Sequence, residues 1–289
     1  MKMKSKTVVF FGNEKLATGL GKVSPVIKEA VESAGYTIEK VITGPLDELG
    51  THTSKLAVLA AYGQIIPQRI LDEFPEGIIN IHPSLLPKYR GTSPIEQAIL
   101  DNEPKTGVSI MRLTKGMDEG PLYTQKSIPL SGRETKEELA TKLQALGANL
   151  LVEVLEKITT GTAKLRAQPH PDRATYTKKI EKSDGLIDWK KPGHTIVQEI
   201  RAYAGWPKSR TLLGGIDMII TEGYSTPGSP EHRVFGNVNT IASDKSLFAV
   251  TSGDGSLVWV ERLIPIGKKE MSTAEFLRGY GNRFTSVEN

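Results

Sequence analysis

The chain has 289 residues, of which 38% are hydrophobic and 24% charged, values typical of soluble globular proteins. It contains no cysteine, which excludes disulfides, thiolate nucleophiles and cysteine-bound zinc, and its five histidines lack the spacing of metal ligands, so we expect no metal site. The apolar runs are too short for a signal peptide or a membrane span, which predicts a cytoplasmic protein with no membrane contact. Nothing in the sequence requires more than a monomer.

In chain order, the first half alternates apolar strand-like runs with amphipathic segments. We predict strands at residues 7–12, 37–43, 55–61, around Asn80, and at 106–114. Helices are predicted from Val23 to near Gly35, from Ser93, and from Thr135, where an apolar stripe runs from Leu139 to Ile158. This alternation predicts an α/β fold with a doubly wound, Rossmann-like parallel sheet, in a domain over residues 1–158.

The pattern changes in the last third of the chain. Short β-rich runs at 211–213, 217–221, 234–241, 247–250 and 257–263 are separated by Gly, Ser and Asp, which predicts a small barrel domain over residues 184–289. A final helix is predicted from Ser272, with Glu275 completing a capping box and Met271 packing against Phe276. Trp189 and Trp206 are interpreted as packing residues.

Residues 159–183 are predicted to form a basic linker. Seven Lys or Arg side chains face only two acidic ones between positions 157 and 182, in a chain whose net charge is +4. Gly161, Pro169 and Pro171 argue against a continuous helix. The segment is either a solvated surface strap or a contact for the phosphates of RNA.

The segment around residue 80 is the strongest candidate for a site. Asn80 and His82 follow an apolar run at i and i+2, so in an extended chain both side chains point to the same face. Pro83 favours an extended His82, and the loop to Gly91 precedes a helix, an arrangement that binds ligands in open α/β sheets. An amide donor beside an imidazole can stabilise an oxyanion and move a proton. The alternative is a loop-capping Asn and a partly exposed His.

Three segments resemble the folate-dependent formyltransferase family, and most closely its members that act on methionyl-tRNA. They are residues 60–67 (AAYGQIIP), residues 80–91 (NIHPSLLPKYRG) and residues 117–121 (MDEGP). The resemblance implies that Asp118, which alone would be interpreted as a solvated turn residue, joins Asn80 and His82 as the catalytic set. It also implies that the second domain is an OB-like barrel.

The resemblance further implies the reaction and its partners. The expected reaction transfers a formyl group from the co-substrate 10-formyltetrahydrofolate to the α-amine of methionine on initiator methionyl-tRNA, with no metal. Folate contacts are expected at Tyr62, Gly63, Ile65, Ser84, Leu85, Leu86 and Pro87. RNA contacts are expected from the linker cations Lys164, Arg166, Arg173, Lys178 and Lys179.

The sequence departs from the family at two places. Only residues 44–54 separate the second and third predicted strands, where the family has a long insert that holds the acceptor end of the tRNA, and the first turn reads Phe11-Gly12-Asn13 where the family tends to have Gly-Thr-Pro. Either the tRNA is recognised differently, or the sequence lacks a segment. A sugar-nucleotide N-formyltransferase with the same folate donor is the alternative function. A catalytically idle RNA-binding or assembly module is a further alternative.

Overall fold

The computed structural model describes residues 5–12, 23–228, 238–241 and 246–284. It divides into two compact units, one formed by residues 1–98, 103–132 and 137–179, and the other by residues 99–102, 133–136 and 180–289. Most of the predicted linker therefore belongs to the first unit. Within the described part of the chain, no helix combines the length and apolar character that a bilayer span requires.

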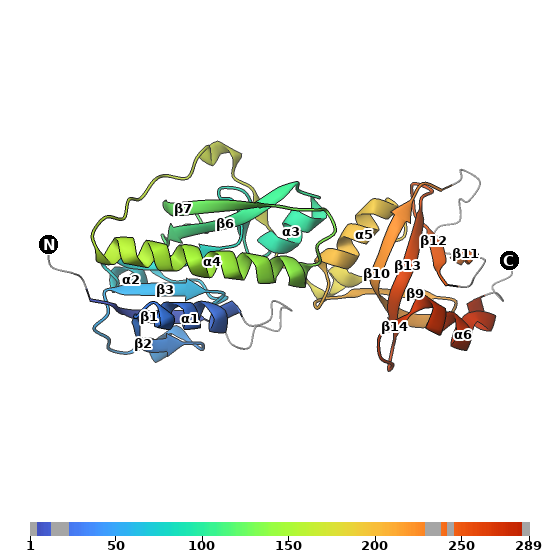
Figure 1. Ribbon diagram of the computed structural model, residues 1–289, viewed down its shortest axis with the longest axis horizontal. Coiled ribbons are helices and arrows are strands. Elements are labelled where there is room, and N and C mark those ends of the chain that lie inside the picture. The colour runs from blue at the N-terminus through green and yellow to red at the C-terminus, as the bar shows by residue number, and fades with distance from the viewer. Residues whose placement is uncertain (1–4, 13–22, 229–237, 242–245, 285–289) are drawn as a thin grey trace. The chain divides into compact units, whose positions relative to one another are not determined.

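Up to residue 177 the chain alternates strands and helices (Figure 1). The strands are β1 (Thr7–Gly12), β2 (Thr37–Ile42), β3 (Leu56–Ala60), β4 (Gly77–His82), β5 (Arg90–Gly91), β6 (Lys105–Arg112), β7 (Leu122–Pro129) and β8 (Tyr176–Thr177). The helices are α1 (Val23–Ser33), α2 (Gln68–Asp72), α3 (Pro94–Leu100) and α4 (Lys136–Thr159), with short 3-10 turns at Leu46–Leu49 and Pro171–Arg173.

The main sheet has the order β2-β1-β3-β4-β6-β7. Its first four strands are parallel, as predicted, whereas β6 runs antiparallel to β4 and β7 antiparallel to β6. The sheet is therefore mixed rather than wholly parallel. Residues 113–121 join β6 to β7 and are too few for the helical crossover that a parallel pair usually needs, so these strands form a hairpin.

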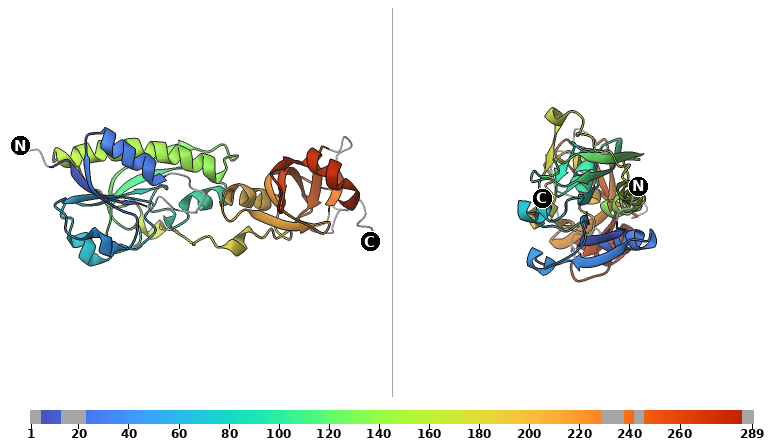
Figure 2. Two further views of the ribbon diagram at one scale, coloured as in Figure 1. Left: turned by 90° about the horizontal axis from the view of Figure 1, so that it is seen from below. Right: turned by 90° about the vertical axis from the view of Figure 1, so that its left-hand side faces the viewer.

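Helices cover both faces of this sheet. In Figures 1 and 2, α1 and α4 lie on one face and α2 on the other. The predicted stripe of α4 is buried at Leu139, Leu143, Leu150, Val154 and Ile158, which explains why this long helix lies flat on the sheet. On the opposite side, Phe11, Tyr62 and Phe74 pack edge to face in one apolar cluster.

The second unit is built on a curled antiparallel sheet. Its strands are β9 (Ser209–Leu213), β10 (Ile216–Thr226), β11 (Val238–Ile241), β12 (Phe248–Thr251), β13 (Leu257–Pro265) and β14 (Met271–Ser272), in the order β11-β12-β13-β10-β9 with β14 on β13. A 3-10 turn at Lys182–Gly185, α5 (Gly193–Ala202) and α6 (Thr273–Phe284) complete it. The part of the predicted strand over residues 234–237 lies outside the described residues.

Two sequence predictions in this unit can be compared with the structure. The capping box of α6 is confirmed, because the Ser272 amide donates to the Glu275 carboxylate and the Glu275 amide donates back to the Ser272 hydroxyl. Trp189 packs against the core, but Trp206 is 37% exposed, so its interpretation as a packing residue is wrong. An exposed loop before Pro207, rather than a strand face, carries this indole.

The short connection between β2 and β3 is closely tied to the sheet. Glu39 in β2 accepts hydrogen bonds from the hydroxyl of Ser54 and from the amide and hydroxyl of Thr53. Leu49 is buried in the apolar cluster, and His52 stacks on Phe74 with 4.6 Å between ring centres. The hydrogen bonds from Ser54 and Thr53 lower the pKa of the Glu39 carboxyl from 4.5 to about 2.

Replacing Glu39 is expected to destabilise the protein in a pH-dependent way. The pKa of Glu39 is lower in the folded than in the unfolded protein, so its contribution is present above about pH 4.5 and is lost as the pH falls towards about 2. Glu39→Gln should therefore lower the free energy of unfolding at neutral pH, by on the order of 1 kcal/mol for a partly exposed group. The difference from wild type should shrink on acidification.

Urea unfolding of both proteins at several pH values measures this difference. Glu153→Gln, at an exposed position of α4, is the matched control and should follow the wild type at every pH. A Glu39→Gln deficit that stays constant down to about pH 2 would show that the hydrogen-bonded charge is not its cause.

Candidate active site

Asn80 and His82 occupy the end of β4, at the centre of the main sheet. β4 is flanked by β3 and β6, and this placement buries the two side chains to 7% and 4% exposure. The two residues alternate with Ile81, so their side chains share one face, as the spacing predicts. The strand thus presents an amide and an imidazole side by side where the loop to Gly91 begins.

The hydrogen bond of His82 fixes which ring nitrogen carries the proton. Nε2 lies 2.9 Å from the carbonyl oxygen of Tyr89 in a buried position. A carbonyl only accepts, so Nε2–H must donate, and Nδ1 is left for other partners. Tyr89 has a φ of 62°, a left-handed conformation that turns the chain back over His82. The loop therefore sets both the tautomer and the orientation of the imidazole.

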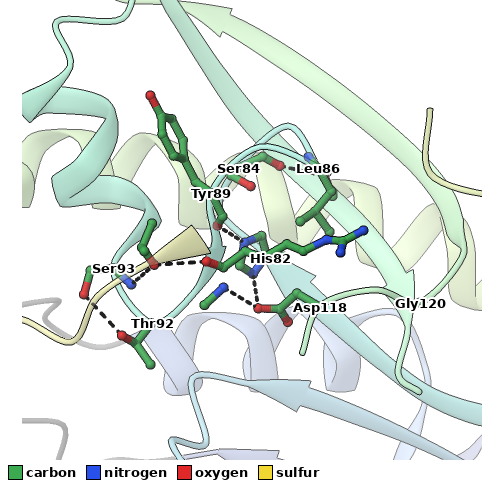
Figure 3. Close-up of polar contacts among 12 residues, drawn as sticks. His82, Ser84, Leu86, Tyr89, Thr92, Ser93, Asp118 and Gly120 are labelled. Atoms are coloured by element: carbon green, nitrogen blue, oxygen red, sulfur yellow. Dashed lines mark hydrogen bonds and ion pairs between the residues drawn. The ribbon is translucent and has the colours of Figure 1, made fainter. Parts of the chain in front are cut away.

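Asp118 lies on the other side of the same ring (Figure 3). Its Oδ2 is 3.7 Å from Nδ1 of His82 and accepts a 2.8 Å hydrogen bond from the Gly91 amide. The Asp118 side chain is 15% exposed, and its backbone is left-handed, with a φ of 51°. The structure thus brings all three predicted catalytic residues to one place, although Asp118 lies in the β6–β7 turn, far from β4 in sequence.

The predicted folate loop, Ser84–Pro87, is held from beneath by β6 and β7. The Ser109 hydroxyl donates to the Ser84 carbonyl at 2.6 Å and accepts from the Leu86 amide at 3.1 Å. The Gln125 amide donates to both the Leu86 carbonyl and the Ser109 hydroxyl at 2.8 Å. Ser84 and Leu86 are buried, so the loop is shaped by these supports, which the sequence analysis missed.

The other predicted folate residues differ in exposure. Tyr62 is buried and donates its hydroxyl to the Gly44 carbonyl at 2.6 Å, and burial and the charge of Glu48 raise its pKa. Ile65 is 80% exposed, which is unusual for an isoleucine. Tyr62 thus anchors the short connection after β2, while Ile65 is free to contact a ligand. The departure predicted at Asn13 lies outside the described residues.

The predicted linker lies against residues 83–91, the loop after β4 that is named the catalytic loop for the chemistry predicted there. β8 pairs in parallel with β5, which follows Tyr89 directly. Gly91 makes this approach possible, because its φ is 105° and a Cβ there would lie 3.0 Å from the carbonyl oxygen of Thr177. The five linker cations predicted to contact RNA, Lys164, Arg166, Arg173, Lys178 and Lys179, are all exposed.

Arg90 and Gln168 connect the linker to the Asp118 turn. Arg90 is 6% exposed, and its Nε and Nη2 donate to Oε1 of Gln168 at 3.3 and 2.8 Å. Its Nη1 donates to the Tyr176 hydroxyl at 2.8 Å and lies 3.4 Å from the Glu119 carboxylate. Sequence reasoning missed this network because its members lie too far apart in the chain for any spacing rule to connect them.

The arrangement suits acyl transfer to an amine. A buried amide and an imidazole can stabilise an oxyanion, and a carboxylate beside the imidazole can orient it and take part in proton transfer. Among the described residues, no group of three His, Asp or Glu side chains is placed to hold a metal ion.

Comparison with known proteins supports the same chemistry. Residues 2–155 match the family model "Formyl transferase", and residues 179–281 match "Formyl transferase, C-terminal domain". A methionyl-tRNA formyltransferase of Listeria monocytogenes serotype 4a is 36% identical over 267 residues, which cover 91% of this chain and 84% of the relative. That of Halalkalibacterium halodurans is 37% identical over 316 residues, 96% of each chain.

The second alignment is longer than the chain itself, so the relative has residues that this chain lacks. Among solved structures, HypX from Aquifex aeolicus in complex with tetrahydrofolic acid has a TM-score of 0.70 at 16% identity, covering 97% of this chain and 48% of that one. An N-formyltransferase from Helicobacter canadensis has a TM-score of 0.65 at 18% identity, covering 89% and 99%. The family models and the curated relatives show that this chain belongs to the formyl transferase family.

Proposed function

We propose that this protein transfers a formyl group from 10-formyltetrahydrofolate to the α-amine of methionine on initiator methionyl-tRNA. The observation that carries the proposal is that Asp118, in the β6–β7 turn, lies beside His82, which shares the end of β4 with Asn80, in a chain whose curated relatives are methionyl-tRNA formyltransferases. The formyl donor is inferred from the family and from a structural neighbour that binds tetrahydrofolic acid.

The proposed reaction needs no covalent enzyme intermediate. The methionine amine attacks the formyl carbon and forms a tetrahedral oxyanion, which collapses as the bond from carbon to N10 of the folate breaks. The amine loses a proton, and N10 gains one. The new bond is an amide, and tetrahydrofolate leaves.

Each of the three residues has a role in these steps. Because Nε2 of His82 already donates to Tyr89, the nitrogen that acts on the substrate is Nδ1. Protonated at Nδ1, His82 donates to the oxyanion together with the Asn80 amide. Asp118 orients the imidazole and relays the amine proton, directly or through water.

The folate is proposed to contact Ser84, Leu85, Leu86 and Pro87 on one side and Tyr62, Gly63 and Ile65 on the other. The linker cations contact the phosphates of the tRNA, because five exposed positive side chains lie in one segment. This segment approaches the catalytic loop through β8, which supports its contact with the acceptor rather than a purely solubilising role.

The first prediction from the proposed function concerns the three residues assigned to catalysis. Asn80→Ala, His82→Ala and Asp118→Ala should each lower kcat for formylation of initiator methionyl-tRNA by about 10²- to 10⁴-fold, because each removes an oxyanion donor or a proton-transfer group. The control His194→Ala changes an exposed histidine of α5 and should retain activity. Near-normal turnover of His82→Ala would contradict the assignment.

The same assay tests the acceptor. Initiator methionyl-tRNA should be formylated, whereas an amino-sugar nucleotide should not. Formylation of the amino sugar alone would replace the proposed function with the sugar-nucleotide alternative. Comparing initiator with elongator methionyl-tRNA then measures how far the protein discriminates without a long insert after β2.

The second prediction concerns the folate loop. Gln125→Ala removes the hydrogen bonds that hold the Leu86 carbonyl and Ser109, so the KM for 10-formyltetrahydrofolate should rise about tenfold while kcat changes less. Ser127→Ala, at an exposed position of the same strand, is the control. An unchanged folate KM would remove the loop from the proposed folate site.

The third prediction concerns the linker. Lys178→Ala with Lys179→Ala should raise the KM for tRNA about tenfold, leave the folate KM unchanged, and reduce the slope of log KM against log salt by about two. The exposed pair Lys55→Ala and Lys105→Ala removes the same charge outside the linker and serves as the control. Equal effects of both pairs would indicate a general charge effect.

A further inference from the structure

One segment of the predicted linker makes contacts that phosphate binding does not explain. Between the exposed cations, Gln168 is buried and Thr177 pairs with the catalytic loop. These two residues face the protein while their charged neighbours face solvent. We therefore ask what Gln168 and Thr177 hold in place.

Gln168 holds the turn that carries Asp118. Its amide group donates to the backbone carbonyl of Asp118 at 2.6 Å and to that of Gly120 at 2.9 Å. Asp118 has a left-handed backbone, a conformation that is unfavourable for a residue with a side chain and persists only where neighbours restrain it. The two hydrogen bonds from Gln168 supply that restraint at the residue itself.

The other end of Gln168 is held in turn. Its Oε1 accepts two hydrogen bonds from Arg90, whose remaining nitrogen donates to Tyr176. The Tyr176 hydroxyl donates to Glu119 at 3.1 Å, which closes a ring of contacts around the turn. Because Arg90 and Gln168 are buried, these charge-assisted bonds are shielded from water and hold the amide in one orientation.

Residues 175–177, which include β8, hold the backbone that lies on the opposite side of the Asp118 carboxylate. The Thr175 hydroxyl accepts from the Tyr89 amide, and the Thr177 hydroxyl accepts from the Ser93 amide and donates to the Arg90 carbonyl. These bonds fix the backbone on both sides of Gly91, whose amide donates to Asp118. The linker thus restrains the backbone of Asp118 and also the donor that orients its side chain.

We infer that Gln168 is a positioning residue that holds Asp118 against His82, and that the segment from Gln168 to Thr177 is part of the active site. This inference rests on the proposed function, because it assigns Gln168 a role in the same reaction. The exposed cations lie in or next to the same segment, so RNA bound to them would contact the segment that sets the catalytic geometry.

Gln168→Glu tests the donor contacts of the side chain separately from its acceptor contacts. A carboxylate can still accept from Arg90 but cannot donate to the carbonyls of Asp118 and Gly120. At saturating tRNA, kcat should fall by about 10- to 100-fold, as for a misplaced catalytic group, while the KM for tRNA changes by less than about threefold. Arg166→Gln changes the net charge by the same amount at an exposed neighbour and is expected to act on the KM for tRNA instead.

Hydrogen exchange of the Gly91 amide gives a readout that does not depend on activity. This amide donates to Asp118, so its exchange should be about tenfold or more faster in Gln168→Glu and Gln168→Leu, as in Asp118→Ala, while amides of β1 keep wild-type rates. If Gln168→Leu does not fold, Gln168→Glu decides. Wild-type kcat, or a lower kcat with an unchanged Gly91 exchange rate, would overturn the inference. A wild-type protein that does not formylate methionyl-tRNA would instead refute the proposed function, and the exchange experiment would still test the position of Asp118.

Discussion

The hydrogen bond from His82 to the carbonyl oxygen of Tyr89 is the interaction on which the geometry of the site depends. It commits Nε2 as a donor, so Nδ1, the nitrogen that faces Asp118, is the one left for the proposed chemistry. The bond exists because the loop after β4 turns back at Tyr89 in a left-handed conformation. Every element that holds this loop therefore acts on the imidazole: Ser109 and Gln125 from the sheet below, and Thr175 from the linker. Secondary structure places Asn80 and His82, but contacts with other segments orient the His82 ring.

Much of the fold could be predicted from local patterns, since β1 and β3 are short continuous apolar runs and α4 has an apolar stripe of helical period. The spacing of Asn80 and His82 predicted their shared face for the same reason. Asp118 could not be assigned from its own surroundings, because an acidic residue between glycines is a common turn; only the resemblance to a family identified it. Neither the local pattern nor the family resemblance pointed to Gln168 or Arg90. Their partners lie up to 86 residues away, and two-residue strands such as β5 and β8 have no periodicity to detect. The strand β6 was predicted but its antiparallel direction was missed, because strand direction is set by the connections rather than by the apolar pattern, and β7 was not predicted.

The connection between β2 and β3 runs only from residue 43 to residue 55, and Leu49, His52 and Glu39 hold it to the sheet. Its carbonyl at Gly44 accepts from both Tyr62 and Gln64, next to the exposed Ile65. A change in this connection can therefore reach the proposed folate contacts through Tyr62.

The pairing of β8 with β5 changes what counts as the smallest catalytic piece of this protein. The sheet and its covering helices are complete when α4 ends at Thr159, and a designer guided by secondary structure alone would cut the chain there. Such a fragment would keep Asn80, His82 and Asp118, but it would lack Gln168, Thr175 and Thr177, the side chains that hold the loop and the turn. If the proposed site is correct, a minimal catalytic domain has to continue past Thr177, and a graft of this site onto another scaffold has to carry β8 as a separate segment.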